Sequence, residues 1–344
     1  MSMNSDDFSV ISAKKQTNDK NLDLFLRPQN FEEYYGQEKI KENLKILIEA
    51  AQKRKEALEH ILLYGPAGIG KTSLAHIIAK STGANLKITS GPAIEKVGDL
   101  ASILTNLVDG DILFIDEIHR LNKLVEEILY PAMEDYVLDI IIGKGPSAKT
   151  LQLNLSRFTL IGATTRIGLL SSPFRSRFGV THRLDFYNDG DIEKILNRSS
   201  KILNIKTEKS GIETIAKCSR KTPRVANRLL KRVRDYAEVK RNGIIQEQTA
   251  KEALKMLEID EIGLEPADKR LLKIIIDKFN GGPVGLQALS AASSEEIDTI
   301  EDIYEPFLMQ IGFIARTPRG RVATEHAYKH LGIKYDNKKQ NILL

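Results

Sequence analysis

The stretch that most restricts how this chain can fold is residues 61–74, in which a short apolar run leads into a glycine-rich loop. Ile61–Tyr64 has the composition of a buried strand, and the apolar residues after the loop have helical spacing. Between them, Gly65 and Gly70–Thr72 fit the G-x-x-x-x-G-K-S/T pattern of a P-loop. A chance glycine turn before a helix is the alternative, but strand, loop and helix in this order favour a P-loop and an α/β fold with a parallel sheet.

The P-loop pattern gives each of its residues a task. Its glycines, Gly68 and Gly70 among them, let backbone N–H groups turn toward phosphate oxygens, and the following helix presents its positive end to the same anion. Lys71 would lie against the β- and γ-phosphates, the Thr72 hydroxyl would bind Mg²⁺, and Ser73 completes the nucleotide-binding set. The sequence therefore predicts a site for ATP and Mg²⁺.

Two acids follow a second apolar run. The run at 111–115 reads as a strand and ends in Asp116 and Glu117, which is a Walker B pattern. Asp116 would hold the metal, and Glu117 would act as the general base that polarises the attacking water. A strand that runs into a helix N-terminus, where acids are also favoured, is the alternative. After a P-loop at a βαβ distance, the catalytic interpretation is favoured.

A third apolar run, Phe158–Gly162, ends in polar residues that include Thr165. The carboxyl ends of parallel strands are where such sheets bind ligands, so Thr165 is placed to contact the γ-phosphate or the attacking water. The segment 172–178 then carries Arg175 and Arg177 beside two phenylalanines. These arginines are either surface charges or phosphate ligands, and periodicity alone leaves both open.

Composition excludes several classes of protein. With 344 residues the chain is too long for one core, and its single cysteine excludes a disulfide framework and fits a reducing cytoplasm. Its six histidines show no spacing typical of zinc ligands, and no apolar stretch approaches the ~18 residues that span a bilayer. The net charge of +5 permits a nucleic-acid partner without requiring one.

Residues 136–155 read as a β-hairpin inserted into the α/β domain. Its apolar triplet, Ile140, Ile141 and Ile142, cannot all face one side of a two-stranded ribbon. An exposed apolar edge predicts a protein partner. The alternative is that the hairpin folds back on its own domain.

The second half of the chain predicts two further modules. From Asp189 to Glu258 the pattern is helical throughout, with Arg224 directly after the proline that begins one helix. From residue 266, three helices precede a short hairpin, which describes a winged helix-turn-helix. The turn between Arg316 and Arg321 would be the wing, and its arginines would contact DNA phosphates or a minor groove. A merely exposed basic turn is the alternative.

Several separated stretches together resemble the RuvB family of AAA+ ATPases, the bacterial motors of Holliday-junction branch migration. The resemblance covers the chain from about Leu22 to Leu331. Its stretches are the P-loop and the segments 113–120, 162–166, 281–285 and 316–321. Many ATPases share the first two, whereas the last three, in this order and with the hairpin, are far more specific.

The resemblance implies roles that spacing alone left open. Arg177 corresponds to an arginine finger that enters a neighbouring subunit's site, Thr165 to sensor 1, and Arg224 to the sensor 2 residue that reads the γ-phosphate. Arg316 and Arg321 match DNA-contacting arginines, and the hairpin matches the element that docks on the junction-binding partner. The positions that match lining residues of the family's nucleotide pocket are Leu26, Arg27, Glu134, Asp135, Tyr136 and Tyr187.

The family also implies an architecture and an activity. We expect disordered tails at 1–20 and 337–344, an AAA+ ATPase domain at 21–186, a helical lid at 187–258 and a winged-helix domain at 259–336. The implied activity is ATP-driven branch migration by a homo-hexameric ring on duplex DNA at four-way junctions, with RuvA-like and RuvC-like partners, in the cytoplasm and without a membrane. A clamp loader or replication initiator, and a nucleotide-binding transcriptional regulator, are the rival classes. The hairpin and wing argue against the first, and Glu117 with Arg177 argues against the second.

Overall fold

The structure is a computed structural model that describes residues 25–142 and 149–335. The expected disordered tails, 1–20 and 337–344, lie outside these ranges. The chain's contacts divide it into two compact units, and the second contains Pro66–Ile69, Phe186–Leu196 and the residues from Ile205 onward. Among the described residues, no helix is long and apolar enough to cross a membrane.

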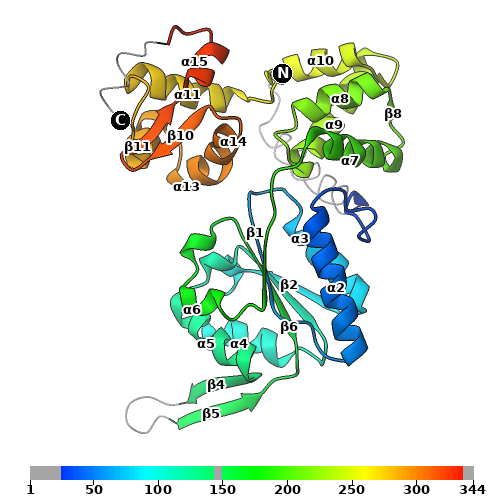
Figure 1. Cartoon of the computed structure of the whole chain (residues 1–344), viewed down its shortest axis with the longest axis vertical. Helices are drawn as coiled ribbons and strands as arrows, with labels where there is room; N and C mark the ends of the chain where they lie inside the picture. Colours follow the sequence, from blue (N-terminus) through cyan, green and yellow to red (C-terminus); the bar gives the residue numbers. More distant parts are fainter. Residues whose placement is uncertain (1–24, 143–148, 336–344) are drawn as a thin grey trace, which may run out of the picture. The chain divides into compact units, whose positions relative to one another are not determined.

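The first unit is built on a five-stranded sheet with the order β2-β3-β6-β1-β7, and every neighbouring pair is parallel (Figure 1). The strands are β1 Ile61–Tyr64, β2 Leu86–Ser90, β3 Ile112–Asp116, β6 Thr159–Thr164 and β7 Val180–Arg183. All six residues of β6 are buried, as expected for a central strand covered on both faces. The predicted α/β fold with a parallel sheet is confirmed, although β7 was not predicted.

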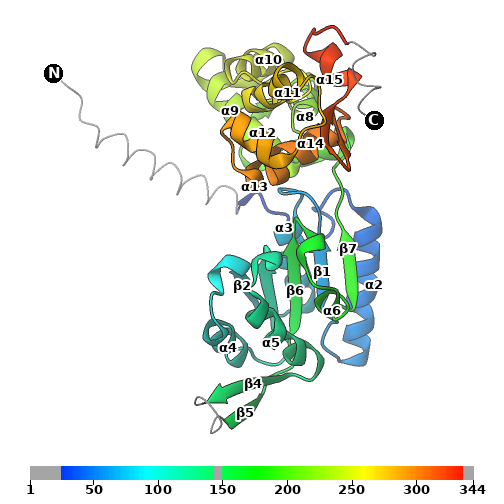
Figure 2. The same ribbon diagram turned by 90° about the vertical axis from the view of Figure 1, so that its left-hand side faces the viewer.

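Helices cover both faces of this sheet (Figure 2). On one face lie α2 Glu38–Arg54 and α3 Lys71–Thr82, and on the other lie α4 Val97–Thr105, α5 Lys123–Glu134 and the short α6 Ser172–Arg175. The helical spacing at 121–130 followed by Pro131 predicts a helix that ends at this proline, and that prediction is wrong, because α5 continues to Glu134. A proline inside a helix loses one backbone hydrogen bond and crowds the preceding turn, but the buried face of α5 continues past it with Ala132 and Met133.

The predicted hairpin is present as the antiparallel pair β4 Val137–Ile142 and β5 Lys149–Asn154. It projects from the end of the first unit in both views (Figures 1 and 2). Leu138 is fully buried in the cluster of α4 and α5, so the base of the hairpin packs on its own domain. The side chains of the predicted partner-binding residues, Ile140, Ile141 and Ile142, lie outside what the structure describes.

The second unit begins its helical part with α7 Asp189–Ile202, whose residues from Asn197 group with the first unit. The other helices of this part are α8 Lys209–Lys217, α9 Pro223–Lys240 and α10 Glu247–Met256. The prediction of helix throughout is wrong in detail, because β8 Lys206–Thr207 and β9 Ile244–Ile245 form a short parallel pair. Runs of two residues are too short to produce a readable alternation.

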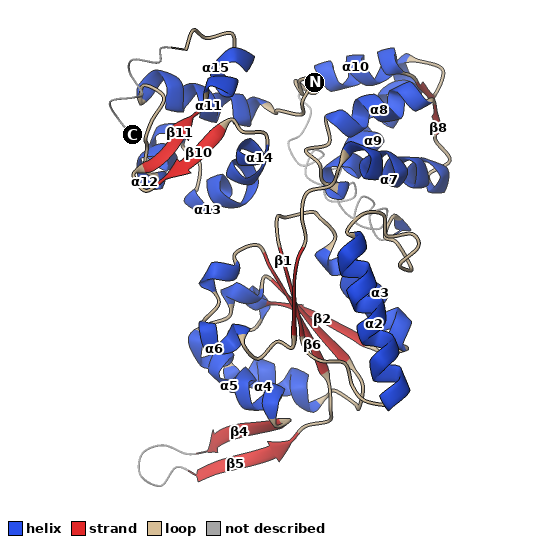
Figure 3. Cartoon of the chain, viewed as in Figure 1, coloured by secondary structure: helices blue, strands red, loops and turns tan. Residues whose placement is uncertain are grey.

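The rest of the second unit has the predicted helices and hairpin (Figure 3). They are α11 Pro266–Lys278, α12 Leu286–Ser293, α13 Ile297–Thr299, α14 Glu305–Gln310, β10 Ile314–Thr317, β11 Gly320–Ala323 and α15 Glu325–His330. The spacing at 299–311 predicts the third of the three helices as one α-helix, which is wrong in detail, since a π-helical turn at Ile300–Tyr304 interrupts it. α15 was not predicted.

Two buried polar groups connect the helical part of this unit to α11 and its flank. The thiol of Cys218 donates to the Asp260 carbonyl at 3.3 Å, and burial raises its pKa to about 11. Arg220 is also buried and pairs with Asp268, the fully buried N3 residue of α11, at 3.2 Å. These contacts belong to a single compact unit.

Candidate active site and nucleic-acid interface

The ends of three neighbouring strands bring several of the predicted site residues, but not Arg177, to one edge of the sheet. β6 lies between β3 and β1, with Gly162 opposite Ile115 and Thr164 opposite Tyr64. Because parallel strands end at the same edge, the residues that follow these three strands face one region. They are Gly65 after β1, Asp116 and Glu117 at the end of β3, and Thr165 after β6.

The P-loop has the geometry of an anion cradle. Gly65 and Gly70 adopt positive φ angles of 143° and 100°, which side-chain-bearing residues rarely do. The Lys71 ammonium is buried and donates to the Gly65 carbonyl at 2.8 Å, so it is held inside the loop. Gly70 precedes the twelve-residue helix α3 and has no side chain that could cap it, and the N-terminus of a helix attracts anions.

Gly70 also packs against an aromatic side chain that the sequence did not indicate. A Cβ at Gly70 would lie 2.8 Å from the hydroxyl oxygen of Tyr34, which is buried. A larger residue at this position would require the Tyr34 side chain to move, in addition to the strain of a φ of 100°. Nothing in the local pattern around Tyr34 distinguishes it from a core residue.

Glu117 and Thr165, which follow neighbouring strands, are in contact. Glu117 has a φ of 48°, unusual for a residue other than glycine, and its backbone N–H donates to the Asp116 carboxylate at 3.0 Å. The Thr165 hydroxyl donates to a Glu117 carboxylate oxygen at 3.3 Å. A strained backbone that aims an acid at a partner on the next strand is typical of a functional site.

His119 is a site residue whose role sequence reasoning missed. Its Nδ1 lies 3.3 Å from the Glu117 carboxylate and 2.9 Å from the Thr164 hydroxyl, and its side chain is almost fully buried. It therefore joins the end of β3 to the end of β6. The only signal in the sequence was its position two residues after Glu117.

Arg177 lies in a separate cluster. Its guanidinium donates to the Pro173 carbonyl at 2.6 Å and to the Glu134 carboxylate at 3.3 Å, and it stacks on the Tyr130 ring at 4.3 Å. Within the described part of the chain, these recorded partners belong to α5 and α6 and none to the P-loop. The two arginines of this segment thus differ, because Arg177 is held by named partners while Arg175 ends α6 with an exposed side chain.

The other predicted lining residues at the end of α5 occupy different environments. Glu134 pairs with Arg177, and Asp135 is exposed. Tyr136 has a φ of 55° and packs edge-on against Phe158 at 6.0 Å. Of the three, the structure brings only Glu134 to another predicted site residue.

Leu26 and Arg27 precede α2 and lie beside α3. The Leu26 side chain is buried, and Arg27 reaches His76 of α3, with 2.8 Å between Nη1 and Nε2. Burial, and then the positive charge of Arg27, lower the pKa of His76. The contact places this segment on the helix that begins with Lys71.

Within the second unit, Gly68, Tyr187 and Arg224 form a third group. The Tyr187 hydroxyl donates to the Ile69 carbonyl at 3.1 Å, and the Arg224 amide donates to the Gly68 carbonyl at 3.3 Å. A Cβ at Gly68, whose φ is 78°, would lie 2.9 Å from the Cβ of Arg224. The middle of the P-loop therefore packs on the start of α9.

The wing carries its two predicted DNA-contacting arginines in unequal settings. Arg316 is half exposed at 51%, whereas Arg321 is 12% exposed, and both donate to Glu305, which is only 2% exposed. The Nε atoms of Arg316 and Arg321 lie 3.0 and 3.1 Å from the same Glu305 oxygen. The hydrogen bond to the Glu305 carboxylate stabilises the charged form of Arg316 and outweighs the opposite effect of burial, so the pKa of Arg316 is raised.

The backbone of the wing packs closely against the 281–285 segment. Val284 and Arg321 exchange two backbone hydrogen bonds, at 2.9 and 2.8 Å. Gly320 has a φ of 139°, and a Cβ there would lie 2.4 Å from the Val284 carbonyl oxygen. A Cβ at Gly282 would similarly lie 2.3 Å from the Arg321 oxygen. Only glycine fits at both positions, which gives the 281–285 segment a physical reason for its composition.

Comparisons with known proteins decide the family. Residues 26–184 match the RuvB P-loop domain of Holliday junction DNA helicase, residues 187–260 the RuvB AAA lid domain, and residues 261–332 the RuvB C-terminal winged helix domain. The chain belongs to the RuvB family. The recognition and the fold class predicted from the sequence are confirmed.

RuvB relatives are similar over nearly the whole chain. The RuvB subunit of the Holliday junction branch migration complex from Dehalococcoides mccartyi is 59% identical, covering 96% of this chain and 95% of that protein. The corresponding subunit from Chloroflexus aggregans is 56% identical, with 96% and 94% covered. The solved Thermotoga maritima RuvB branch migration motor is 49% identical, has a TM-score of 0.84, and covers 91% of this chain and 100% of that one.

Membership of the RuvB family makes this a nucleotide-binding chain, and its strand-end residues fit such a ligand. Thr72 at the start of α3 and Asp116 at the end of β3 each carry oxygen donors, and no group of three or more acidic, histidine or cysteine residues suited to a metal exists in the described ranges. That donor set suits a cation that also takes phosphate oxygens and water, as Mg²⁺ does.

Proposed function

We propose that this chain is the ATP-driven motor of Holliday-junction branch migration, acting as a ring of six copies on duplex DNA. The observation that carries the proposal is the division of the catalytic residues into two clusters. Lys71, Glu117 and Thr165 gather at the strand ends, whereas Arg177 is held by Glu134 and Tyr130. Within the ranges that the structure describes, the recorded partners of Arg177 do not include the P-loop of its own chain, which supports a role for this arginine in the site of a neighbouring copy.

In this proposal each residue of the strand-end cluster has one role in ATP hydrolysis. Lys71 and the first amides of α3 bind the β- and γ-phosphates, and Glu117 accepts a proton from the attacking water. Thr165 orients the Glu117 carboxylate through the hydrogen bond of 3.3 Å. Thr72 and Asp116 are the proposed protein ligands of Mg²⁺, which supplies charge neutralisation on the phosphate oxygens when bound.

The remaining site residues surround the nucleotide in this proposal. Leu26, Arg27 and Tyr187 line the nucleoside part of the pocket, Gly68 and Ser73 belong to the phosphate loop, and Arg224 reads the γ-phosphate. From a neighbouring copy, Glu134, Asp135 and Tyr136 lie with Arg177 at the shared face. Support comes from the contacts of Arg27 with α3 and of Arg224 with Gly68.

The proposed function also requires contacts with DNA and with partner proteins. Arg316 and Arg321 contact the phosphate backbone of duplex DNA, which makes binding indifferent to sequence. The hairpin, through Ile140, Ile141 and Ile142, docks on a RuvA-like junction-binding protein, and a RuvC-like resolvase acts on the same four-way junction. A single thiol and a DNA substrate support a cytoplasmic location.

Two inactive variants test the shared site. Arg177→Ala should bind ATP normally but lose about 10³–10⁵ in turnover, the range typical of an arginine finger. Lys71→Ala should lose nucleotide binding at its own P-loop while still offering Arg177 to a neighbour. Mixing the two purified chains on junction DNA should therefore restore part of the ATPase activity that neither shows alone.

Branch migration is then measured on a four-way junction with a RuvA-like protein and ATP. Dissociation of the junction by the wild-type chain, dependent on both, supports the proposal. Lys194→Ala, which removes an exposed lysine from α7, is the control that should leave both assays unchanged. Absence of recovery at every mixing ratio would refute the shared site, and full turnover by isolated monomers would refute the ring.

A further inference from the structure

We propose that Arg198 is a positioning residue for the nucleotide: it fixes the backbone of Leu26 and Arg27 and thereby sets the affinity for the nucleoside part of ATP. The inference rests on the proposed function, in which this segment lines the nucleotide pocket. Arg198 stands in the last third of α7, in the part that groups with the first unit. No sequence pattern distinguished it from the other charges of that helix.

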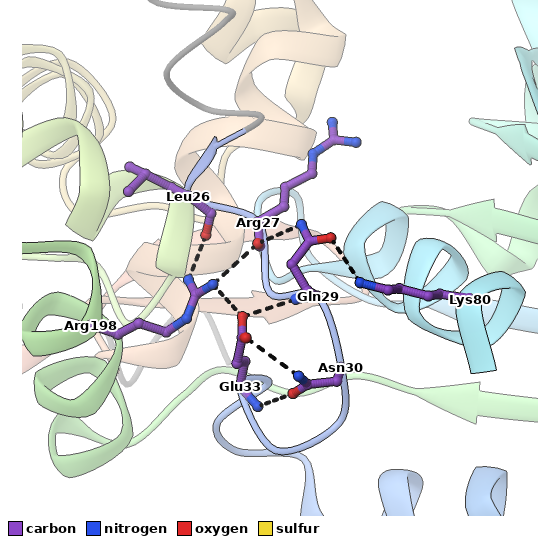
Figure 4. Close-up of polar contacts among 7 residues, drawn as sticks. All are labelled: Leu26, Arg27, Gln29, Asn30, Glu33, Lys80 and Arg198. Atoms are coloured by element: carbon purple, nitrogen blue, oxygen red, sulfur yellow. Dashed lines mark hydrogen bonds and ion pairs between the residues drawn. The ribbon is translucent and has the colours of Figure 1, made fainter. Parts of the chain in front are cut away.

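The contacts of Arg198 converge on one short segment (Figure 4). One guanidinium nitrogen donates to the Leu26 carbonyl at 2.9 Å, and the other donates to the Arg27 carbonyl at 3.3 Å. The second nitrogen also pairs with the Glu33 carboxylate. Arg198 is only 17% exposed, so these bonds form in a partly desolvated place where they are stronger than at an open surface.

Glu33 extends the arrangement back to the same segment. Its carboxylate accepts from the Gln29 amide at 3.0 Å, and the Gln29 side chain donates to the Arg27 carbonyl at 3.2 Å. Its own amide donates to the Asn30 side chain at 2.9 Å. Although burial alone would raise the pKa of Glu33, bonds from Gln29 and Arg198 lower it, so the carboxylate stays charged at neutral pH.

Two adjacent carbonyls and a carboxylate require a forked donor. Arginine presents several N–H groups in a fixed plane, whereas lysine offers one flexible ammonium. One nitrogen of the guanidinium holds the Leu26 carbonyl and the other holds the Arg27 carbonyl and the Glu33 carboxylate, whereas a lysine at position 198 would have to serve all three from a single nitrogen. This requirement separates a positioning role from a simple positive charge.

The opposite side of the segment faces the P-loop helix. In Figure 4 the Arg27 guanidinium points away from Arg198, and its recorded partner is His76 of α3 at 2.8 Å. The segment is thus tied by its carbonyls to α7 and by its side chain to α3. Because Lys71 and the P-loop bind the phosphates, what Arg198 governs is the part of the ligand that carries base and ribose.

The test compares two ligands that share phosphates and differ in the nucleoside. ADP and tripolyphosphate, each with Mg²⁺, are titrated calorimetrically into the full chain. Arg198→Met should weaken ADP binding about tenfold, equivalent to ~1.4 kcal/mol, and tripolyphosphate binding by less than about twofold. Arg198→Lys should recover less than half of this loss, and the KM for ATP should rise while kcat at saturation stays within about threefold.

Controls make each outcome decisive. Lys194→Met, one turn earlier on α7 and 62% exposed, should change neither affinity. If Arg198→Met does not fold, Glu33→Gln replaces it and should weaken ADP about two- to threefold with tripolyphosphate unchanged. If the variants bind both ligands equally more weakly, or bind ADP as the wild type does, the role of Arg198 is refuted while the proposed function is not. A wild-type chain that binds neither ligand would instead refute the proposed function.

Discussion

The ion pair between Arg220 and Asp268 gives the sharpest prediction about stability. The Arg220 guanidinium lies 3.2 Å from Asp268, donates to the Ile303 carbonyl at 3.2 Å and stacks on the Phe307 ring at 4.6 Å. Asp268 is 0% exposed and also accepts from the Glu265 amide at the start of α11. We expect Arg220→Met to keep the packing of the side-chain stem while leaving a buried carboxylate without its cation.

The size of the effect follows from that burial. Removing one partner of a buried ion pair costs about 3–5 kcal/mol, because the remaining charge is desolvated and unpaired. Burial already raises the pKa of Asp268, and Arg220 acts in the opposite direction. Without Arg220 the pKa of Asp268 rises further, so the folded state takes up a proton at a higher pH than the unfolded state does. The variant should therefore lose most stability at high pH and regain part of it as the pH falls.

Hydrogen exchange measures this locally in the full chain. Amides of α11 should exchange at least about a hundredfold faster in Arg220→Met at pH 7.5, and the difference from wild type should shrink at pH 5.5 after correction for intrinsic rates. Adding Asp268→Asn should restore much of the protection, because it removes the unpaired charge. Arg232→Met, which breaks a pair with Asp235 at 47% exposure, is the matched control and should cost no more than about 1 kcal/mol. A loss below that limit in Arg220→Met, or a loss that grows toward acid, would refute the reasoning.

Three further predictions concern the wing and the sheet. Gly320→Ala should destabilise the wing by about 1–3 kcal/mol, because its Cβ would meet the Val284 carbonyl at a positive φ. Gly168→Ala in the first unit, with open space around it, should stay within about 0.5 kcal/mol; hydrogen exchange of the amides around each substituted position measures both. Arg316→Ala should make the slope of log K against log salt for duplex DNA shallower by about 1, measured by anisotropy, and an unchanged slope would exclude a phosphate contact. His60 accepts from the Leu160 amide and burial lowers its pKa, so stability should fall as the pH drops below about 6.5, where the unfolded state takes up the proton. In His60→Gln the melting temperature between pH 7.5 and 5.5 should vary less than in wild type; equal pH dependence would contradict this.

Local patterns predicted the elements that carry chemistry, because these combine strong periodicity with fixed motif spacing. The P-loop, the strand that ends in Asp116 and the hairpin were placed within a few residues of their bounds. The same reasoning missed β7, since Val180–Arg183 has only alternating half-burial at the sheet edge. It also merged α13 and α14, because a π-helical turn keeps nearly helical spacing.

Side-chain partners were harder to predict than elements. Glu117 and Thr165 were predicted from strand ends, and the structure places them in contact. Their buried neighbour His119 comes from the same turn as Glu117, but its bond to Thr164 depends on the pairing of β3 with β6. Contacts of long separation, such as Arg198 with Leu26 across 172 residues, leave no periodic signal in a single sequence.

The exposure of the two wing arginines could not be predicted from the sequence. Arg316 and Arg321 look equivalent in the sequence, since both flank a turn and both are basic. Both pair with one carboxylate, Glu305, which lies on a different element, and the Arg316 side chain is half exposed whereas that of Arg321 is nearly buried. Charge patterns predict that a surface is basic, but they do not reveal which cations are already neutralised.

The protonated state of Cys218 has a practical consequence for studying motion in this chain. With a pKa of about 11, it carries about two to three orders of magnitude less thiolate at neutral pH than an exposed cysteine with a pKa near 8.5. Maleimide dyes should therefore react with a cysteine introduced at an exposed position and spare the native one. Pairs of fluorophores can be attached without first replacing a side chain that packs beside Asp260.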